Sequence, residues 1–232
     1  MVNLNFTIKD LTADKLDSVK LKCSNCSFWT DNSKLSLFDN LNISLTIWEL
    51  IKSWFFELRS LSGKKRFLPF FIENGGFAKA AYSRKKCIGL LLAGKYYLFP
   101  KLKLFNFYPP DPNSIFLGCI YVLPEYRNLG VGKKLLMSLE KELIKNNISA
   151  IETVAKRFND DMDIEEYVNS PVIPVKFLIK NGFYVKKNDE LYPLLRLDLS
   201  AISMVKDFIK TRFAFRNVLS ERVEKSPVNF KN

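Results

Sequence analysis

Residues 124–136 read PEYRNLGVGKKLL and lie where an apolar run changes into a helical pattern. The preceding stretch, Ser114 to Leu123, is apolar and rich in β-branched residues, which predicts a buried strand. The following apolar residues form one helical stripe: Val131, Leu135, Leu136, Leu139 and Leu143. A glycine-containing turn between a strand and a helix offers unpaired N–H groups, so it favours an anion such as a phosphate.

The spacing of this turn disagrees with two common nucleotide-binding patterns. A P-loop requires Gly-x4-Gly-Lys-Ser/Thr, but Arg127 stands five residues before Gly132 and Lys134 replaces the hydroxyl residue. A dinucleotide fingerprint requires a third glycine where Leu135 stands. The spacing therefore disfavours a nucleoside triphosphate or NAD and leaves the pattern Arg127-x-x-Gly130-x-Gly132.

The remaining patterns predict a mixed α/β sheet in one domain, residues 1–199, with a basic helical extension at 200–232. Strands are expected at 2–9, 77–83, 87–93, 150–155, 184–185 and 194–199. An amphipathic helix is expected at 44–61, and a second helix begins at Pro171 or Pro174 and ends at Asn181. The prolines of 108–112 predict a loop, and 12–22 reads as a short helix or a loop.

The composition excludes several classes of site. With no histidine in the chain, Ser-His-Asp triads, Cys-His pairs and HExxH zinc sites are impossible. Four cysteines are too few for a disulfide scaffold. No uncharged apolar run is as long as the roughly 18 residues that a membrane span needs, and no signal peptide is apparent, so we expect a cytoplasmic protein without a membrane span. A net charge of +12 allows nucleic-acid binding, but the lysines are spread along the chain, which makes this the lesser expectation.

Three motifs resemble those of a known family. RNLGVG (127–132), preceded by YVLPEY, is similar to the (Gln/Arg)-x-x-Gly-x-(Gly/Ala) hallmark of the GNAT superfamily of acyl-CoA-dependent N-acetyltransferases. PVKFLIKNGF (174–183) resembles the later helix and Gly-Phe ending of that fold, and CSNCSFW (23–29) resembles a pattern in bacterial GNAT proteins. The resemblance covers about 77–199 and implies the GNAT acyl-CoA N-acyltransferase fold with a C-terminal helical extension.

The resemblance also implies a place for acetyl-CoA. The main chain of the central strand at Ile120, Tyr121 and Val122 would pair with the pantetheine arm, and the Val122 N–H would polarise the thioester carbonyl. The pyrophosphate would lie against the turn and the helix start, formed by Arg127, Asn128, Leu129, Gly130, Val131, Gly132, Lys133 and Lys134.

The implied reaction is direct attack by a primary amine of a small molecule or peptide. The tyrosine that usually protonates the thiolate is replaced by Leu178, so Tyr167, Tyr121 or a water would take that role. Candidate acceptor-binding residues are Trp29, Asp160, Asp161 and Asp163.

No metal site is expected. The acidic segment 159–167 lacks the glycine of a calcium loop, and a zinc site at Cys23 and Cys26 would need Cys87 and Cys119 from predicted inner strands. A homodimer is a further expectation. Two alternatives remain: a catalytically weak or regulatory acetyl-CoA-binding protein of the same fold, and a nucleic-acid-binding protein.

Overall fold

The computed structural model describes residues 4–12, 15, 19, 21, 26, 28, 29, 67–159, 162–164, 167 and 170–199. Several predictions lie outside these residues. They are the amphipathic helix at 44–61, the extension at 200–232, and the residues Cys23, Asp160 and Asp161.

The described residues form strands, helices and short 3-10 helices (η) in this order: β1 (Thr7–Asp10), α2 (Phe67–Glu73), β2 (Phe77–Ser83), β3 (Lys86–Gly94), η4 (Tyr96–Leu98), η5 (Pro100–Leu104), β4 (Ser114–Val122), η6 (Pro124–Tyr126), α3 (Val131–Lys145), β5 (Ala150–Lys156), β6 (Ile173–Pro174), α5 (Val175–Lys180), β7 (Tyr184–Lys187) and β8 (Leu194–Asp198).

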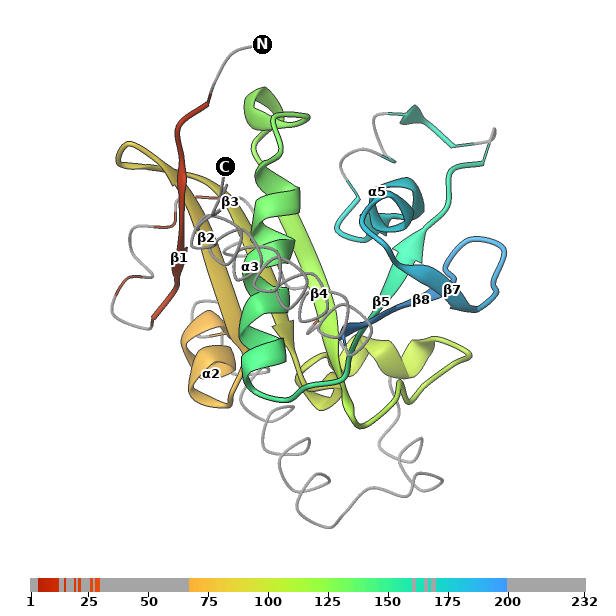
Figure 1. The fold of residues 1–232 in the computed structure, drawn as a ribbon. Coiled ribbons are helices and arrows are strands. Elements are labelled where there is room, and N and C mark those ends of the chain that lie inside the picture. The colour runs from red at the N-terminus through yellow and green to blue at the C-terminus, as the bar shows by residue number, and fades with distance from the viewer. Residues whose placement is uncertain are drawn as a thin grey trace, which may run out of the picture.

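The strands of the described residues form one mixed sheet, in the order β1-β2-β3-β4-β5-β8-β7 with β6 beside β5 (Figure 1). Neighbours β1 to β4 pair antiparallel, β4 and β5 pair parallel, and β8 and β7 continue antiparallel. The predicted mixed α/β sheet is therefore confirmed. Strand β3 lies between two neighbours and is buried from Cys87 to Gly94, which explains its apolar sequence on both faces.

Helices cover both faces of the sheet. Helix α3 lies across one face and buries its predicted apolar stripe there, together with Leu178 of α5 and Phe183. The opposite face packs against Phe71 of α2 and a cluster of aromatic side chains that includes Trp29 and Phe99. Each face thus has its own core, and α3 and α5 share one of them.

Two elements depart clearly from the sequence prediction, and a third resolves an alternative that the prediction left open. The first strand is Thr7–Asp10 rather than 2–9, because Thr7 already pairs with Tyr82 and the partner strand ends one residue later. Helix α2 was not predicted, since FLPFFIE contains a proline and no polar face. The later helix begins at Val175 with Pro174 as its N-cap, which decides between the two predicted starts.

Candidate functional site

Strands β4 and β5 separate beyond their first three residues. Their ladder ends at the pair Phe116 and Glu152, whereas β4 stays paired with β3 as far as Val122. Figure 1 shows β4 and β5 diverging from that point toward the loop that precedes α3. The second half of β4 therefore has an edge that β5 does not pair.

The backbone groups of this edge can be assigned from the opposite ladder. Leu123 N–H donates to Ile88 O at 3.0 Å, and bonding alternates along an antiparallel pair. The N–H and C=O groups of Val122 and Ile120 consequently point away from β3. These are two of the residues whose main chain the resemblance placed against the pantetheine arm.

The loop after β4 contains two residues with left-handed backbone and leads directly into the start of α3. Asn128 has φ 61° and Gly130 has φ 81°, both left-handed, and a Cβ on Gly130 would meet nothing within 4 Å. Gly130 is the N-cap of α3, and its carbonyl accepts the first helical hydrogen bond from Lys134 N–H at 3.0 Å. The N–H groups that precede Lys134 have no intrahelical partner, so this terminus suits an anion.

Arg127 connects this loop to the unpaired edge. Its Nε–H donates to the carbonyl of Val122 at 3.1 Å, a contact that is partly buried. A guanidinium is always charged and presents several donors in one plane, so it can hold a carbonyl and still face an anion. The contact fixes the end of β4 relative to the α3 N-terminus.

The two glycines of the motif have different surroundings. Gly130 faces open space, whereas a Cβ on Gly132 would lie 3.3 Å from the Phe177 ring and 3.7 Å from Ile120 Cγ2. Gly132 therefore lets α5 and β4 approach the first turn of α3. Phe177 was not predicted as a site residue, because its neighbours come from distant parts of the chain.

The two lysines of the first turn point to different surroundings. The ammonium of Lys134 lies over the ring of Phe6 at 4.5 Å, so its side chain packs on the N-terminal segment. The prediction that Lys134 adds charge beside the loop is not supported by this placement. Lys133 is exposed and stays a prediction.

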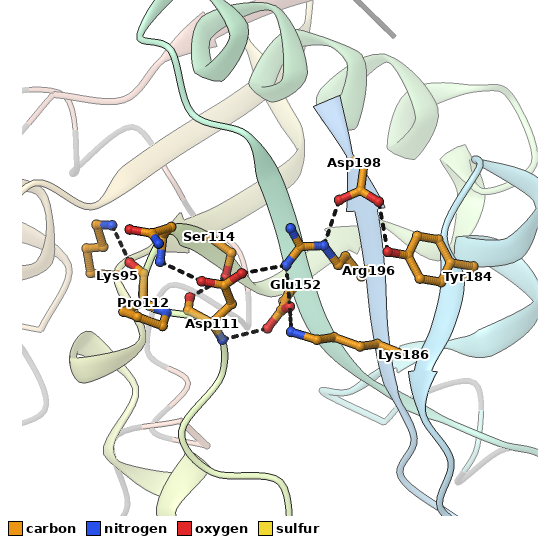
Figure 2. A network of polar contacts seen from close by, with 10 residues as sticks. Lys95, Asp111, Pro112, Ser114, Glu152, Tyr184, Lys186, Arg196 and Asp198 are labelled. Carbon is orange, nitrogen blue, oxygen red and sulfur yellow. Dashed lines mark hydrogen bonds and ion pairs between the residues drawn. The ribbon is translucent and has the colours of Figure 1, made fainter. Parts of the chain in front are cut away.

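A polar network closes the end at which β4 and β5 are still paired (Figure 2). Glu152 of β5 is fully buried and accepts hydrogen bonds from Asp111 N–H at 2.9 Å and from Arg196 at 2.8 Å, and it also pairs with Lys186. Arg196 in turn donates to Asp111 at 2.8 Å and to Asp198 at 2.6 Å. The network joins β5, β7 and β8 to the loop before β4.

The charges of the network perturb one another. The pKa of Asp198 lies below its ordinary value, chiefly because Arg196 donates to it. Burial alone would raise the pKa of Asp111, but the Asn113 N–H and Arg196 outweigh burial and lower it. Burial opposes the charge of Arg196, yet its three carboxylate partners raise its pKa, so it stays protonated.

The sequence analysis did not identify this network. A signal was nevertheless present, because Glu152 is a single carboxylate in the apolar run AIETVA, and a charged residue in a buried strand needs a partner. The identity of that partner could not be read from spacing, since Arg196 is 44 residues away.

The candidate proton donors for the leaving thiolate, Tyr121 and Tyr167, are not brought together, and the usual tyrosine position is Leu178. Leu178 is fully buried in the core under α5, and Tyr121 packs against the core on the opposite face. Tyr167 is partly buried and donates to Lys156 O at 3.4 Å, and burial raises its pKa, so it keeps its proton at neutral pH. Within the described part of the chain, Tyr121 and Tyr167 share no hydrogen bond or ring contact.

Two predicted acceptor residues can be placed. Asp163 is exposed, in agreement with a surface loop. Trp29, however, is only 7% exposed and lies in the aromatic core, where its indole N–H donates to Gly118 O at 2.6 Å. The prediction that Trp29 covers an acceptor is therefore wrong, because its ring has no open face to offer.

Cys87 and Cys119 are not activated as nucleophiles. Burial, with a smaller contribution from Cys26, raises the pKa of Cys119 to about 12, and burial raises the pKa of Cys87.

No cluster of three metal-ligating side chains occurs among the described residues. None of the helices described there has the length and apolar character needed to cross a membrane.

Comparison with protein families decides the classification. The profile of the acetyltransferase (GNAT) family matches residues 45–163, about half of the chain. The chain belongs to the GNAT acetyltransferase family. The GNAT profile contains β4, the loop at Arg127 to Gly132 and α3, which are the elements of the site described above. No curated protein matches the sequence significantly.

Solved structures similar to this GNAT chain include three acetyltransferases. PaiA N-acetyltransferase from Thermoplasma acidophilum, in complex with coenzyme A, has 18% identity and TM-score 0.48, covering 84% of this chain and 99% of its own. A GNAT acetyltransferase from Staphylococcus aureus Mu50 has 16% and 0.45, with coverage of 84% and 99%. The ribosomal-protein-S18-alanine N-acetyltransferase from Escherichia coli has 12% and 0.42, with coverage of 84% and 94%.

Proposed function

We propose that this GNAT protein transfers the acetyl group of acetyl-CoA to a primary amine of a small molecule or peptide in the cytoplasm. The observation that carries the proposal is the edge of β4 that β5 does not pair, which leads directly into an α3 N-terminus whose first N–H groups have no intrahelical partner. An extended pantetheine arm needs a strand edge to pair with, and a pyrophosphate needs unpaired N–H donors. The residues present fit both parts of an acyl-CoA.

The main chain supplies binding and polarisation. We assign the N–H groups from Asn128 to Lys133 to the pyrophosphate. The N–H and C=O groups of Ile120 and the N–H of Val122 would hold the arm, since the Val122 carbonyl accepts from Arg127. When bound, acetyl-CoA supplies an activated thioester. The Val122 N–H donates to the carbonyl of that thioester and stabilises the negative charge that develops on its oxygen.

The proposal specifies direct attack by the amine rather than an acyl-enzyme on Cys119. That cysteine adjoins Ile120 on β4, but a thiol with a pKa of about 12 is almost entirely protonated at neutral pH and is a poor nucleophile. The amine must lose its own proton first. For a lysine-like amine at pH 7, transfer of this proton to water adds about 4 to 5 kcal/mol to the activation free energy when no dedicated base takes it.

Protonation of the leaving thiolate has no dedicated tyrosine at position 178. Coenzyme A has a thiol pKa near that of an ordinary cysteine, about 8.5, so water can serve as the proton source. Tyr167 keeps its proton and is the phenol that we propose as an alternative source. The burial of Leu178 also motivates a second candidate function, a GNAT protein that binds acetyl-CoA but turns it over slowly.

The first experiment measures acetyl-CoA binding by calorimetry and thiol release with a panel of primary amines. Binding together with release on one or more amines supports the proposal. Tight binding without turnover on any amine supports the second candidate. Salt-dependent retention of nucleic acid without acetyl-CoA affinity overturns both.

A pair of variants tests the loop assignment. Gly130→Val forces a β-branched residue into φ 81° and places its methyl groups in the space that the anion would use, so we expect at least tenfold weaker acetyl-CoA binding. Gly132→Ala is the matched control, because its Cβ would contact the Phe177 ring at 3.3 Å and Ile120 Cγ2 at 3.7 Å instead of entering the open space beside Gly130. Equal affinity of Gly130→Val and the wild type would refute the loop assignment.

A further inference from the structure

We propose that Trp29 and Thr153 are positioning residues that keep β4 and β5 apart. Each donates a side-chain hydrogen bond to a β4 carbonyl at the point where the two strands separate. The inference deepens the proposed function, because the separated edge is where the pantetheine arm would pair.

Thr153 donates a hydrogen bond to the first β4 carbonyl beyond the β4–β5 ladder. That ladder ends at Phe116, and the next carbonyl, Leu117 O, accepts from Thr153 Oγ1 at 2.7 Å. Thr153 is fully buried, and its other close acceptor, Val154 O at 3.1 Å, lies in its own strand. A hydroxyl on β5 therefore takes the place that a β5 backbone N–H would have in a continued ladder.

Trp29 donates a hydrogen bond to the next β4 carbonyl, that of Gly118. The β3–β4 register shifts at this point, because Leu92 pairs with Cys119 but Ala93 pairs with Leu117, which leaves Gly118 as the extra residue of a bulge. Gly118 O accepts from the Trp29 indole N–H at 2.6 Å. The two carbonyls that could extend pairing with β5 are thus both satisfied by side chains.

The surroundings of the bulge allow little adjustment. A Cβ on Gly118 would lie 2.3 Å from the Phe99 ring, so only glycine fits there. The indole of Trp29 packs edge-on against Phe116, with centroids 5.3 Å apart, and its own carbonyl accepts from Lys101 N–H at 3.1 Å. Ring packing and a backbone hydrogen bond therefore both hold Trp29 in place.

Removing either donor leaves a buried carbonyl without a partner, which is unfavourable. The backbone N–H groups of β5 are the replacements that the sheet offers. Strand β5 already pairs with β6 at Ala155 and Lys156, so a ladder that continues past Gly118 must displace β6 before it covers the β4 groups at Ile120 and Val122. The side-chain donors thus act against closure of the edge.

The test uses Thr153→Val, which removes the hydroxyl and keeps the shape of the side chain. Its matched control is Ser114→Ala, which removes another buried hydroxyl of the same strand pair, one that donates to Asp111 O at 2.7 Å on the closed side of the ladder. We expect acetyl-CoA binding, measured by calorimetry, to weaken about tenfold in Thr153→Val and by less than twofold in Ser114→Ala.

Trp29→Phe tests the second donor, with Phe107→Leu as a control that removes part of a buried ring from the same aromatic core. We expect weaker acetyl-CoA binding in Trp29→Phe only. If Trp29→Phe fails to fold, the threonine variant alone decides. Binding within twofold of the wild type in Thr153→Val overturns the inference.

Hydrogen exchange separates this inference from the proposed function, because it needs no acetyl-CoA. Closure of the edge slows amide exchange at Ile120 and Val122 in Thr153→Val, whereas Ser114→Ala leaves it unchanged. Unaltered exchange at both amides refutes the inference. A wild type that does not bind acetyl-CoA refutes the proposed function but leaves this exchange result interpretable.

Discussion

Replacing Glu152 with glutamine removes the central charge of the network in Figure 2 and nearly preserves the shape of the side chain. Glu152 is fully buried and holds Arg196, Lys186 and the Asp111 N–H. Breaking a buried ion pair typically costs 3–5 kcal/mol of unfolding free energy. The structure places this variant at the lower end, about 3 kcal/mol.

Two features justify the lower value. The side chain of Lys186 is 31% exposed, so its ammonium can return to water when its partner is lost. Arg196 keeps Asp111 and Asp198, and the net charge of the five groups changes from −1 to zero. The remaining cost in unfolding free energy arises because the glutamine amide has one oxygen to accept hydrogen bonds where the Glu152 carboxylate has two. It therefore cannot satisfy Arg196, Lys186 and the Asp111 N–H together.

Urea unfolding followed by circular dichroism measures this cost, and Glu125→Gln is the control. Glu125 forms an ion pair with Lys86 at 3.0 Å, but both side chains are more than half exposed, so its loss has a far smaller effect. Added salt should reduce the small effect of Glu125→Gln and change that of Glu152→Gln little. If the unfolding free energy of Glu152→Gln lies within about 1 kcal/mol of the wild-type value, the network does not stabilise the junction of β5, β7 and β8 with the loop before β4.

The remaining predictions concern pH. Asp111 and Asp198 have lowered pKa values, so their contribution is complete above about pH 4, the unfolded value, and is lost as pH falls through the folded values. Acid titration of the unfolding free energy should therefore be shallower in Asp198→Asn than in the wild type; identical slopes would contradict this. Burial alone would lower the pKa of Lys79, but its hydrogen bonds to Asp10 and Glu142, both at 2.5 Å, raise it. Its stabilisation is complete below about pH 10.4 and lost above, so Lys79→Met should flatten the alkaline decline in thermal stability, and an unchanged decline would refute that role.

The elements that sequence predicted well are those whose pattern is complete within a few neighbouring residues. Strand β2 was predicted with its observed bounds, and β3, β4, α3 and β5 were predicted to within a residue or two, because burial on one or two faces imposes a period of 2 or 3.6. The loop pattern from Arg127 to Gly132 is local in the same sense. It predicted a tight glycine turn before the helix, in agreement with the left-handed φ of Gly130, while anion binding there stays a prediction.

The rest of the site depends on contacts that local patterns do not contain. The bond between Trp29 and Gly118 spans 89 residues, and that between Arg196 and Glu152 spans 44. Neither partner can be chosen until the strand order is known. Trp29 was assigned to an acceptor for this reason, since an aromatic residue in a loop looks the same whether it fills a core or a cleft.

The sequence by itself determined the family, the mixed sheet and the glycine turn before α3, because these follow from short-range periodicity and from glycines at fixed spacing. Only the tertiary structure decided where β4 and β5 separate and what closes the paired end. Pairing stops where side-chain donors from Thr153 and Trp29 replace backbone donors, and a distant part of the chain supplies the tryptophan. The physical reason is that a buried carbonyl must be satisfied, but any donor that the fold brings within reach can satisfy it.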